Sequence, residues 1–129
     1  MMVLLAQIFG AFFGLLAVIF GAFGAHALKK IFTEDQLKSF ETGVKYQMYH
    51  ALVLLMVGFN FNLDNGHQAA MVYCFIIGVV LFSFSIYGLT FSGAKGKKWK
   101  FLGPITPLGG LLLVAGWALL LYNLIRNLI

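Results

Sequence analysis

The chain carries very little charge for its length. Only 10% of its 129 residues are Asp, Glu, Lys or Arg, whereas 61% are hydrophobic and the mean hydropathy is +0.93. A water-soluble domain of 14.2 kDa needs far more charged side chains to cover its surface. The composition therefore excludes an ordinary soluble protein, and the length predicts a single domain over residues 1–129.

Carboxylates are the scarcest charged groups, and the common catalytic motifs are missing. The four carboxylates are Glu34, Asp35, Glu41 and Asp64. None lies within a long apolar stretch, so no pair can act there as acid and base. The sequence also lacks Gly-x-Ser-x-Gly, His-Glu-x-x-His and a phosphate-binding glycine loop. We therefore predict no catalytic residue. A lipid-modifying enzyme that uses His26 and His50 is the third of the three functions considered, after the two given at the end of this section.

Cysteine is almost absent as well. The single cysteine, Cys74, cannot form an internal disulfide, and no metal-type cysteine spacing exists. Met48 and Met56 lie near His50 in the sequence and could serve a soft metal ion, but methionines at helical spacing usually pack. The sequence predicts neither a metal ion nor a cofactor.

Long apolar stretches are abundant, and there are four of them. A helix needs about 20 apolar residues to cross a bilayer, and three stretches meet that length while one nearly does. The predicted spans cover residues 3–25, 46–62, 69–91 and 105–125. Short connections favour antiparallel neighbours. We therefore expect an all-α integral membrane protein, a four-transmembrane-helix bundle that runs up-down-up-down.

Basic residues lie on alternate connections. Eight of the nine are Lys29, Lys30, Lys38, Lys45, Lys95, Lys97, Lys98 and Lys100, whereas residues 62–68 contain no Lys or Arg. By the positive-inside rule, both lysine-bearing connections are cytoplasmic and both termini are outside. This topology predicts a multi-pass protein of the plasma (inner) membrane. The topology and the anionic headgroups of membrane lipid account for the basic residues, so we expect membrane lipid as a partner and no nucleic acid.

Two helix starts can be predicted. The connection over residues 26–45 is amphipathic, and Thr33-Glu34-Asp35-Gln36 within it is a capping box. A helix that starts there can continue to about Phe61, so that its first three turns project from the bilayer. Farther along, Pro107 suits the first turn of a helix and predicts Thr106 as its N-cap.

Small residues form a row along the first span. They are Gly10, Gly14, Ala17, Gly21 and Gly24, separated by steps of four, three, four and three. This spacing favours one helical face, where small residues let another backbone approach closely. We predict a packing seam against another span or a second protomer; a smooth wall for a lipid or substrate is the alternative. Gly109 and Gly110 predict a second close approach.

A polar face on the second span provides the candidate site. Ser39, Gly43, Gln47 and His50 share this face, and Tyr46 lies beside it. His26 could reach it if the first two spans are neighbours. We therefore take His26, Tyr46, Gln47 and His50 as candidate ligand-binding residues. Structural hydrogen bonding, a lipid, quinone or other amphiphile pocket, proton-linked transport and a His–Met metal site all stay open.

Four segments resemble a known family. They are Gly-Ala-Phe-Gly-Ala-His-Ala-Leu at 21–28, Thr-Gly-Val-Lys-Tyr-Gln-Met-Tyr-His-Ala-Leu at 42–52, Phe-Ser-Phe-Ser-Ile-Tyr at 82–87 and Gly-Pro-Ile-Thr-Pro-Leu-Gly-Gly at 103–110. Together they resemble the small four-span membrane proteins of domain-of-unknown-function family 423, which are similar to eukaryotic transmembrane protein 256. Ser85 stands where that family has glycine. The resemblance implies an integral membrane protein of prokaryotic plasma-membrane type and no particular activity.

These observations favour a non-enzymatic membrane protein. It would act through helix interactions or bind a lipid-like amphiphile, with itself or another membrane protein as partner. The alternative is a small proton- or ion-linked transporter or channel.

Overall fold

The computed structural model describes residues 1–129 except for the side chain of Ala25. The elements are α1 (Met2–Ile19), η1 (Phe20–Gly24), α2 (Ala25–Leu28), α3 (Glu34–Asn60), α4 (Gly66–Val79), η2 (Val80–Phe84), α5 (Ser85–Ala94), η3 (Lys100–Leu102) and α6 (Ile105–Arg126). Here η1 and η2 are π-helical turns and η3 is a 3₁₀ turn. The all-helical prediction is confirmed.

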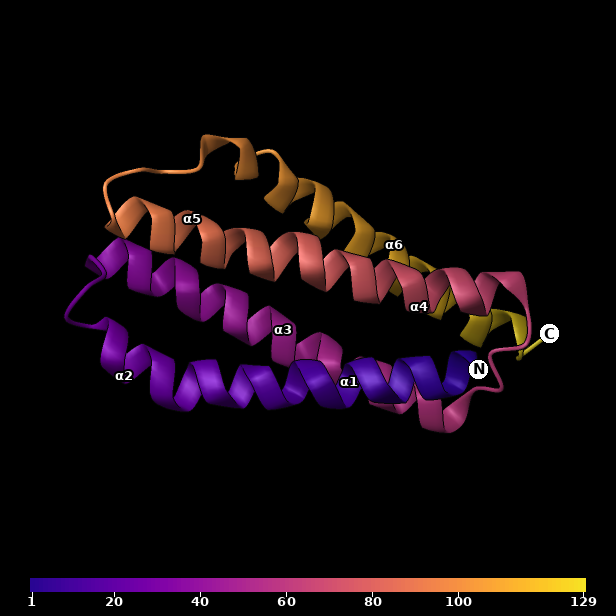
Figure 1. The fold of residues 1–129 in the computed structure, drawn as a ribbon. Coiled ribbons are helices and arrows are strands. Elements are labelled where there is room, and N and C mark those ends of the chain that lie inside the picture. Colours follow the sequence, from indigo (N-terminus) through magenta and orange to yellow (C-terminus); the bar gives the residue numbers. More distant parts are fainter.

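The element order gives four long helical rods, and Figure 1 shows them side by side. The first rod joins α1, η1 and α2 without a break, and the third joins α4, η2 and α5. Three helices are long and apolar enough to cross a membrane: Met2–Gly24, Gly66–Ala94 and Lys100–Arg126. The second rod, α3, is less apolar because it also carries Lys45, Gln47 and His50.

The predicted start of α3 is confirmed. The Thr33 hydroxyl accepts a hydrogen bond from the Gln36 N–H at 3.2 Å, and the Thr33 N–H donates to Gln36 Oε1 at 3.0 Å. Glu34 and Asp35 occupy the first turn, where the helix dipole favours negative charge. The helix then runs unbroken for 27 residues. Residues 26–45 thus contain most of α2, a short turn and the first three turns of α3.

The predicted cap of α6 is wrong. The N-cap residue is Pro104, which has no side-chain cap, and Thr106 lies inside the first turn. Its hydroxyl instead lies 2.6 Å from the Ser85 hydroxyl on α5. The Thr106 hydroxyl, which the local sequence predicts to cap the helix, therefore makes a tertiary contact instead.

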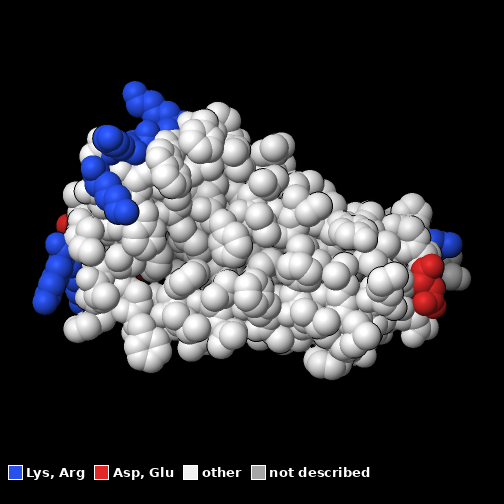
Figure 2. All heavy atoms as spheres, in the orientation of Figure 1, with Lys and Arg blue, Asp and Glu red and all other residues white. Residues whose placement is uncertain are grey.

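Apolar side chains cover the outside of the bundle as well as its core. On α1, for example, Leu4, Ile8, Phe12 and Leu15 are exposed at helical spacing. Figure 2 shows uncharged atoms across the middle of the visible face and charged atoms near both ends. The segments at residues 29–38 and 95–100 lie at the same end, which we call the lysine end, and both termini lie at the other end (Figure 1).

The connection between α3 and α4 folds back into the core. Leu63 is buried and has a positive φ of 59°, unusual for a residue with a branched side chain. This backbone conformation turns its side chain into the apolar core cluster. Asn65 then caps the start of α4, since its side chain accepts from the Gln68 N–H at 2.9 Å.

Candidate functional site

Three residues of the predicted polar face of α3, Gly43, Gln47 and His50, turn into the bundle, whereas Ser39 is exposed. Gln47 is fully buried and His50 is 3% exposed, while Tyr46 beside them remains 40% exposed. Gly43, one turn before Gln47, is also buried. Residues at steps of four and three share a helical face, so this inward face follows from the sequence spacing.

Gln47 connects three rods of the bundle. Its Nε2 donates to the carbonyl oxygen of Phe13 on α1 at 2.8 Å, and its Oε1 accepts from the Tyr87 hydroxyl on α5 at 2.7 Å. Beside it, the Ser83 hydroxyl donates to the Gly43 carbonyl at 2.7 Å. Both functions of the buried amide therefore have partners, which offsets the cost of placing it inside the bundle.

His50 connects α3 to α6. Its Nε2 accepts from the indole N–H of Trp117 at 3.0 Å, and its Nδ1 lies 2.6 Å from the Tyr46 carbonyl oxygen. An indole can only donate and a carbonyl can only accept. The two partners together require a neutral imidazole with its proton on Nδ1.

The four candidate residues do not form one site. Tyr46, Gln47 and His50 are close together on α3, but Tyr46 contributes its carbonyl to His50, and its ring stacks on the imidazole at 15°. His26 lies on α2, is exposed, and makes no hydrogen bond to Gln47 or His50 within the described part of the chain. Among the described residues, every buried side-chain nitrogen and oxygen has a partner. No unsatisfied group here points to a ligand.

The small residues of the first rod lie against α3. A Cβ at Gly10 would lie 2.9 Å from the Ala51 carbonyl oxygen, and one at Gly14 would lie 3.8 Å from Ala51 Cβ. A Cβ at Gly21 would lie 3.3 Å from Val44 Cγ1, and one at Gly24 would lie 3.4 Å from Phe40 Cζ. Ala17, between them and Gly14, is buried. The backbones thus approach most closely at Gly10.

The other predicted close approach involves Gly109 much more than Gly110. A Cβ at Gly109 would collide with the backbone of Leu81 and Phe82, whereas one at Gly110 would meet the Phe82 ring at an ordinary 3.7 Å. Other tight glycines were missed: Gly43, Gly58, Gly78, Gly88 and Gly116. These glycines form no extended row like that on α1, so no comparable pattern marks them in the sequence.

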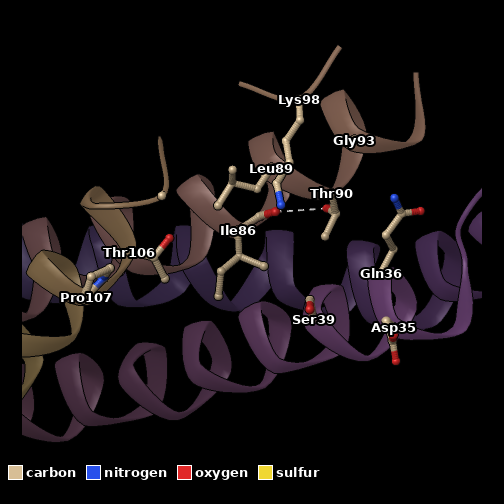
Figure 3. A pocket seen from close by; sticks show the side chains of 11 residues that line it. Asp35, Gln36, Ser39, Ile86, Leu89, Thr90, Gly93, Lys98, Thr106 and Pro107 are labelled. Carbon is tan, nitrogen blue, oxygen red and sulfur yellow. Dashed lines mark hydrogen bonds between the residues drawn. The ribbon is translucent and has the colours of Figure 1, made fainter. Parts of the chain in front are cut away.

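A cavity of about 510 Å³ opens at the lysine end (Figure 3). Its lining comes from α3, from α5, from the connection between α5 and α6, and from the first turn of α6. The lining residues are Asp35, Gln36, Ser39, Ile86, Leu89, Thr90, Gly93, Lys98, Gly103, Thr106 and Pro107. Of these residues, only Ser39 belongs to the polar face that the sequence predicts, because the cavity is formed by segments that are far apart along the chain.

The cavity has an apolar wall and a polar mouth. Ile86, Leu89 and Pro107 contribute the wall. In Figure 3, the Lys98 side chain extends from the loop toward α5, while the Asp35 carboxylate points away from the other labelled side chains. Such a combination suits an amphiphile, since it offers an apolar surface next to polar groups.

Comparisons with known proteins agree with the membrane character. The model of the family described as "Protein of unknown function (DUF423)" matches residues 20–110. The UPF0382 membrane protein YwdK of Bacillus subtilis is 37% identical over 94% of this chain and 96% of its own length. The UPF0382 inner membrane protein YgdD of Escherichia coli is also 37% identical, over 92% of this chain and 88% of its own length.

A UPF0382 membrane protein of Haemophilus influenzae is 35% identical over 88% of both chains. No solved structure matches the chain. All four sequence segments that resemble the family lie within the matched residues 20–110. The family model and the full-length relatives together show that the chain belongs to the DUF423 family, and the relatives named here are membrane proteins.

Proposed function

We propose that this chain is a four-span membrane protein without enzymatic activity that binds a membrane amphiphile in the lysine-end cavity. The observation that carries the proposal is the 510 Å³ cavity, with its apolar wall and its polar mouth at one charged end of the bundle. The binding residues would then be those of the cavity, and Tyr46, Gln47 and His50 would hold the helices together.

The arrangement of the rods supports four spans. The first rod ends at the lysine end with α2, whereas α4 begins at the opposite end (Figure 1). If these two rods cross the bilayer, α3 has to cross it too because it connects them. Its 27 residues give a length of about 40 Å, enough for the hydrocarbon core and some projection. The positive-inside rule favours a cytoplasmic lysine end and outside termini.

The position of the cavity supports a lipid-like ligand. Apolar side chains cover most of the outer surface, so lipid surrounds the proposed spans. The polar mouth lies next to Lys98 and Trp99, residue types that suit the headgroup region. A lipid could place its headgroup at the mouth while its chains follow the apolar surface below.

The buried polar residues favour this proposal over proton-linked transport. A proton carrier has to gain and lose a proton, but protonated His50 would donate from both nitrogens and lose the Trp117 hydrogen bond. Gln47 is likewise held by two partners. Both residues thus have structural tasks that transport would disrupt.

Native mass spectrometry from lipid nanodiscs tests the proposal. We expect the wild-type protein to retain lipid, and Ser39→Leu, which fills the mouth of the cavity, to retain less. Thr42→Leu is the matched control because Thr42 is exposed one turn farther along α3 and does not line the cavity. Equal retention by both variants and the wild type would contradict the proposal. The same spectra give the stoichiometry and test the expected self-association.

A further inference from the structure

We infer that the cavity selects an anionic phospholipid, with its phosphate beside Lys98, over a zwitterionic one. The inference rests on the proposed function, because it assigns a headgroup chemistry to the same site. Three features support it: the position of Lys98, the neutral donors around it and the charge of the lysine end.

Lys98 differs from the other lysines of its loop. It lines the cavity, whereas Lys95, Lys97 and Lys100 do not. Figure 3 shows its side chain extending toward Thr90 and Ile86 on α5. A lysine ammonium is a compact point charge with three donors and commonly binds phosphate. Its position brings that charge to the polar mouth.

Two neutral donors face the same space from α3. The capping box occupies Gln36 Oε1, so the amide Nε2 is directed away from Thr33. This Nε2 lies 3.3 Å from where a Cβ of Gly93 on α5 would be, which places it at the cavity lining. The Ser39 hydroxyl follows one turn later and has no hydrogen-bond partner among the described residues. Both groups can donate to phosphate oxygens.

The hydroxyls of Thr90 and Thr106, which line the cavity, and of Ser85 beside it are already engaged. Ser85 donates to the Phe82 carbonyl or bonds to Thr106, and Thr106 is 3.5 Å from the Leu102 carbonyl. Thr90 donates back to carbonyls of its own helix at 3.0 Å. The donors that remain for a ligand are therefore those of Lys98, Gln36 and Ser39.

Charge at this end favours an anion. Residues 29–38 and 95–100 contain seven lysines and two carboxylates, Glu34 and Asp35. Asp35 lines the cavity, but its carboxylate points away from Lys98 in Figure 3. A zwitterionic headgroup would bring a second, cationic group into this basic region, whereas an anionic headgroup avoids that repulsion.

The apolar wall distinguishes a phospholipid from a free phosphate ester. Ile86, Leu89 and Pro107 would contact the glycerol and the first methylenes of the chains. Each methylene that is removed from water strengthens lipid association. A water-soluble glycerophosphate offers none of these methylenes and should bind poorly.

The test uses nanodiscs made from equal amounts of phosphatidylglycerol and phosphatidylcholine with the same acyl chains. Native mass spectrometry then measures the ratio of anionic to zwitterionic lipid that stays on the protein. We expect a ratio well above one for the wild type and a fall of about fivefold in Lys98→Ala, since one lysine near a lipid surface is worth about 1 kcal/mol. Lys97→Ala, which removes the neighbouring charge outside the cavity, should change the ratio much less.

The outcomes separate the inference from the proposed function. Lipid retained at a ratio near one overturns the headgroup inference and leaves the proposed function standing, whereas no retained lipid in the wild type overturns both. Equal losses in Lys97→Ala and Lys98→Ala reduce the preference to general surface charge and also overturn the inference. Soluble glycerol phosphate that displaces the lipid at low concentration would identify a free phosphate ester as the ligand. Thermal unfolding of each variant in the same detergent checks that it is folded.

Discussion

At the scale of single residues, Gly43 and Gln47 show how a polar residue is accommodated inside the bundle. Gly43 has no side chain, so the ring of Tyr87 can pass close to α3 and reach Gln47, one turn later. A Cβ at Gly43 would lie only 2.8 Å from Tyr87 Cε1. The sequence placed Gly43 on the polar face, but its contact with Tyr87 depends on how α5 lies against α3.

Gly43→Ala should therefore destabilise the protein by roughly 1–3 kcal/mol, since the Tyr87 ring is held by its hydrogen bond and cannot easily move away. Thermal or chemical unfolding in detergent measures this change. Gly14→Ala is the control: its Cβ would lie 3.8 Å from Ala51 Cβ, so we expect no loss and a gain of up to about 1 kcal/mol from helix propensity. Similar effects of the two substitutions would contradict the close contact at Gly43.

The hydrogen bond between Gln47 and Tyr87 can be measured with a double-mutant cycle. Gln47→Met keeps a similar shape, removes two hydrogen bonds and leaves the Tyr87 hydroxyl without its partner, so we expect a loss of roughly 1–3 kcal/mol. Adding Tyr87→Phe should cost less in this background than in the wild type. Strictly additive effects would mean that the two side chains do not interact.

At the scale of elements, local sequence patterns predict a hydrogen bond correctly where the two residues are near each other in the sequence. The capping box of α3 needs only residues 33 and 36, and it forms as predicted. The sequence around Thr106 predicts a helix cap, but its hydroxyl contacts Ser85 on α5 instead. The π-helical turns η1 and η2 widen the helix locally within two continuous rods, and no local sequence pattern marks them.

Thr33→Ala should remove one side of the capping box and destabilise the start of α3 by about 1 kcal/mol. Hydrogen–deuterium exchange should then speed up at the Gln36 amide and its neighbours, while the middle of α3 stays protected. Thr42→Ala is a suitable control because the Thr42 hydroxyl bonds only to the Lys38 carbonyl of the same helix. Unchanged exchange at Gln36 would argue against the cap.

At the scale of the whole molecule, charge and rod direction together predict the topology. The connections before and after α3 lie at opposite ends of the bundle (Figure 1). Single cysteines at Lys30, Asn62 and Lys97, in a Cys74→Ser background, place a reporter on each of three connections.

A membrane-impermeant maleimide added to intact cells should label Asn62→Cys alone, because the other two positions belong to the lysine-bearing, cytoplasmic side. Permeabilised cells should show labelling at all three. Labelling of Lys30→Cys and Asn62→Cys from the same side would mean that α3 does not cross the bilayer.

The sequence by itself determined the membrane character, the helical class, the start of α3 and the inward polar face with Gln47 and His50. These features depend on composition and on spacings of three and four residues, which act within one helix. Only the tertiary structure decided which glycines touch a neighbouring backbone, which partners satisfy Gln47 and His50, and where the cavity opens. Many of those contacts join residues that are far apart along the chain: Phe13 and Gln47 are 34 positions apart, and His50 and Trp117 are 67 positions apart. A contact of that kind depends on how whole helices pack, and no local pattern encodes it.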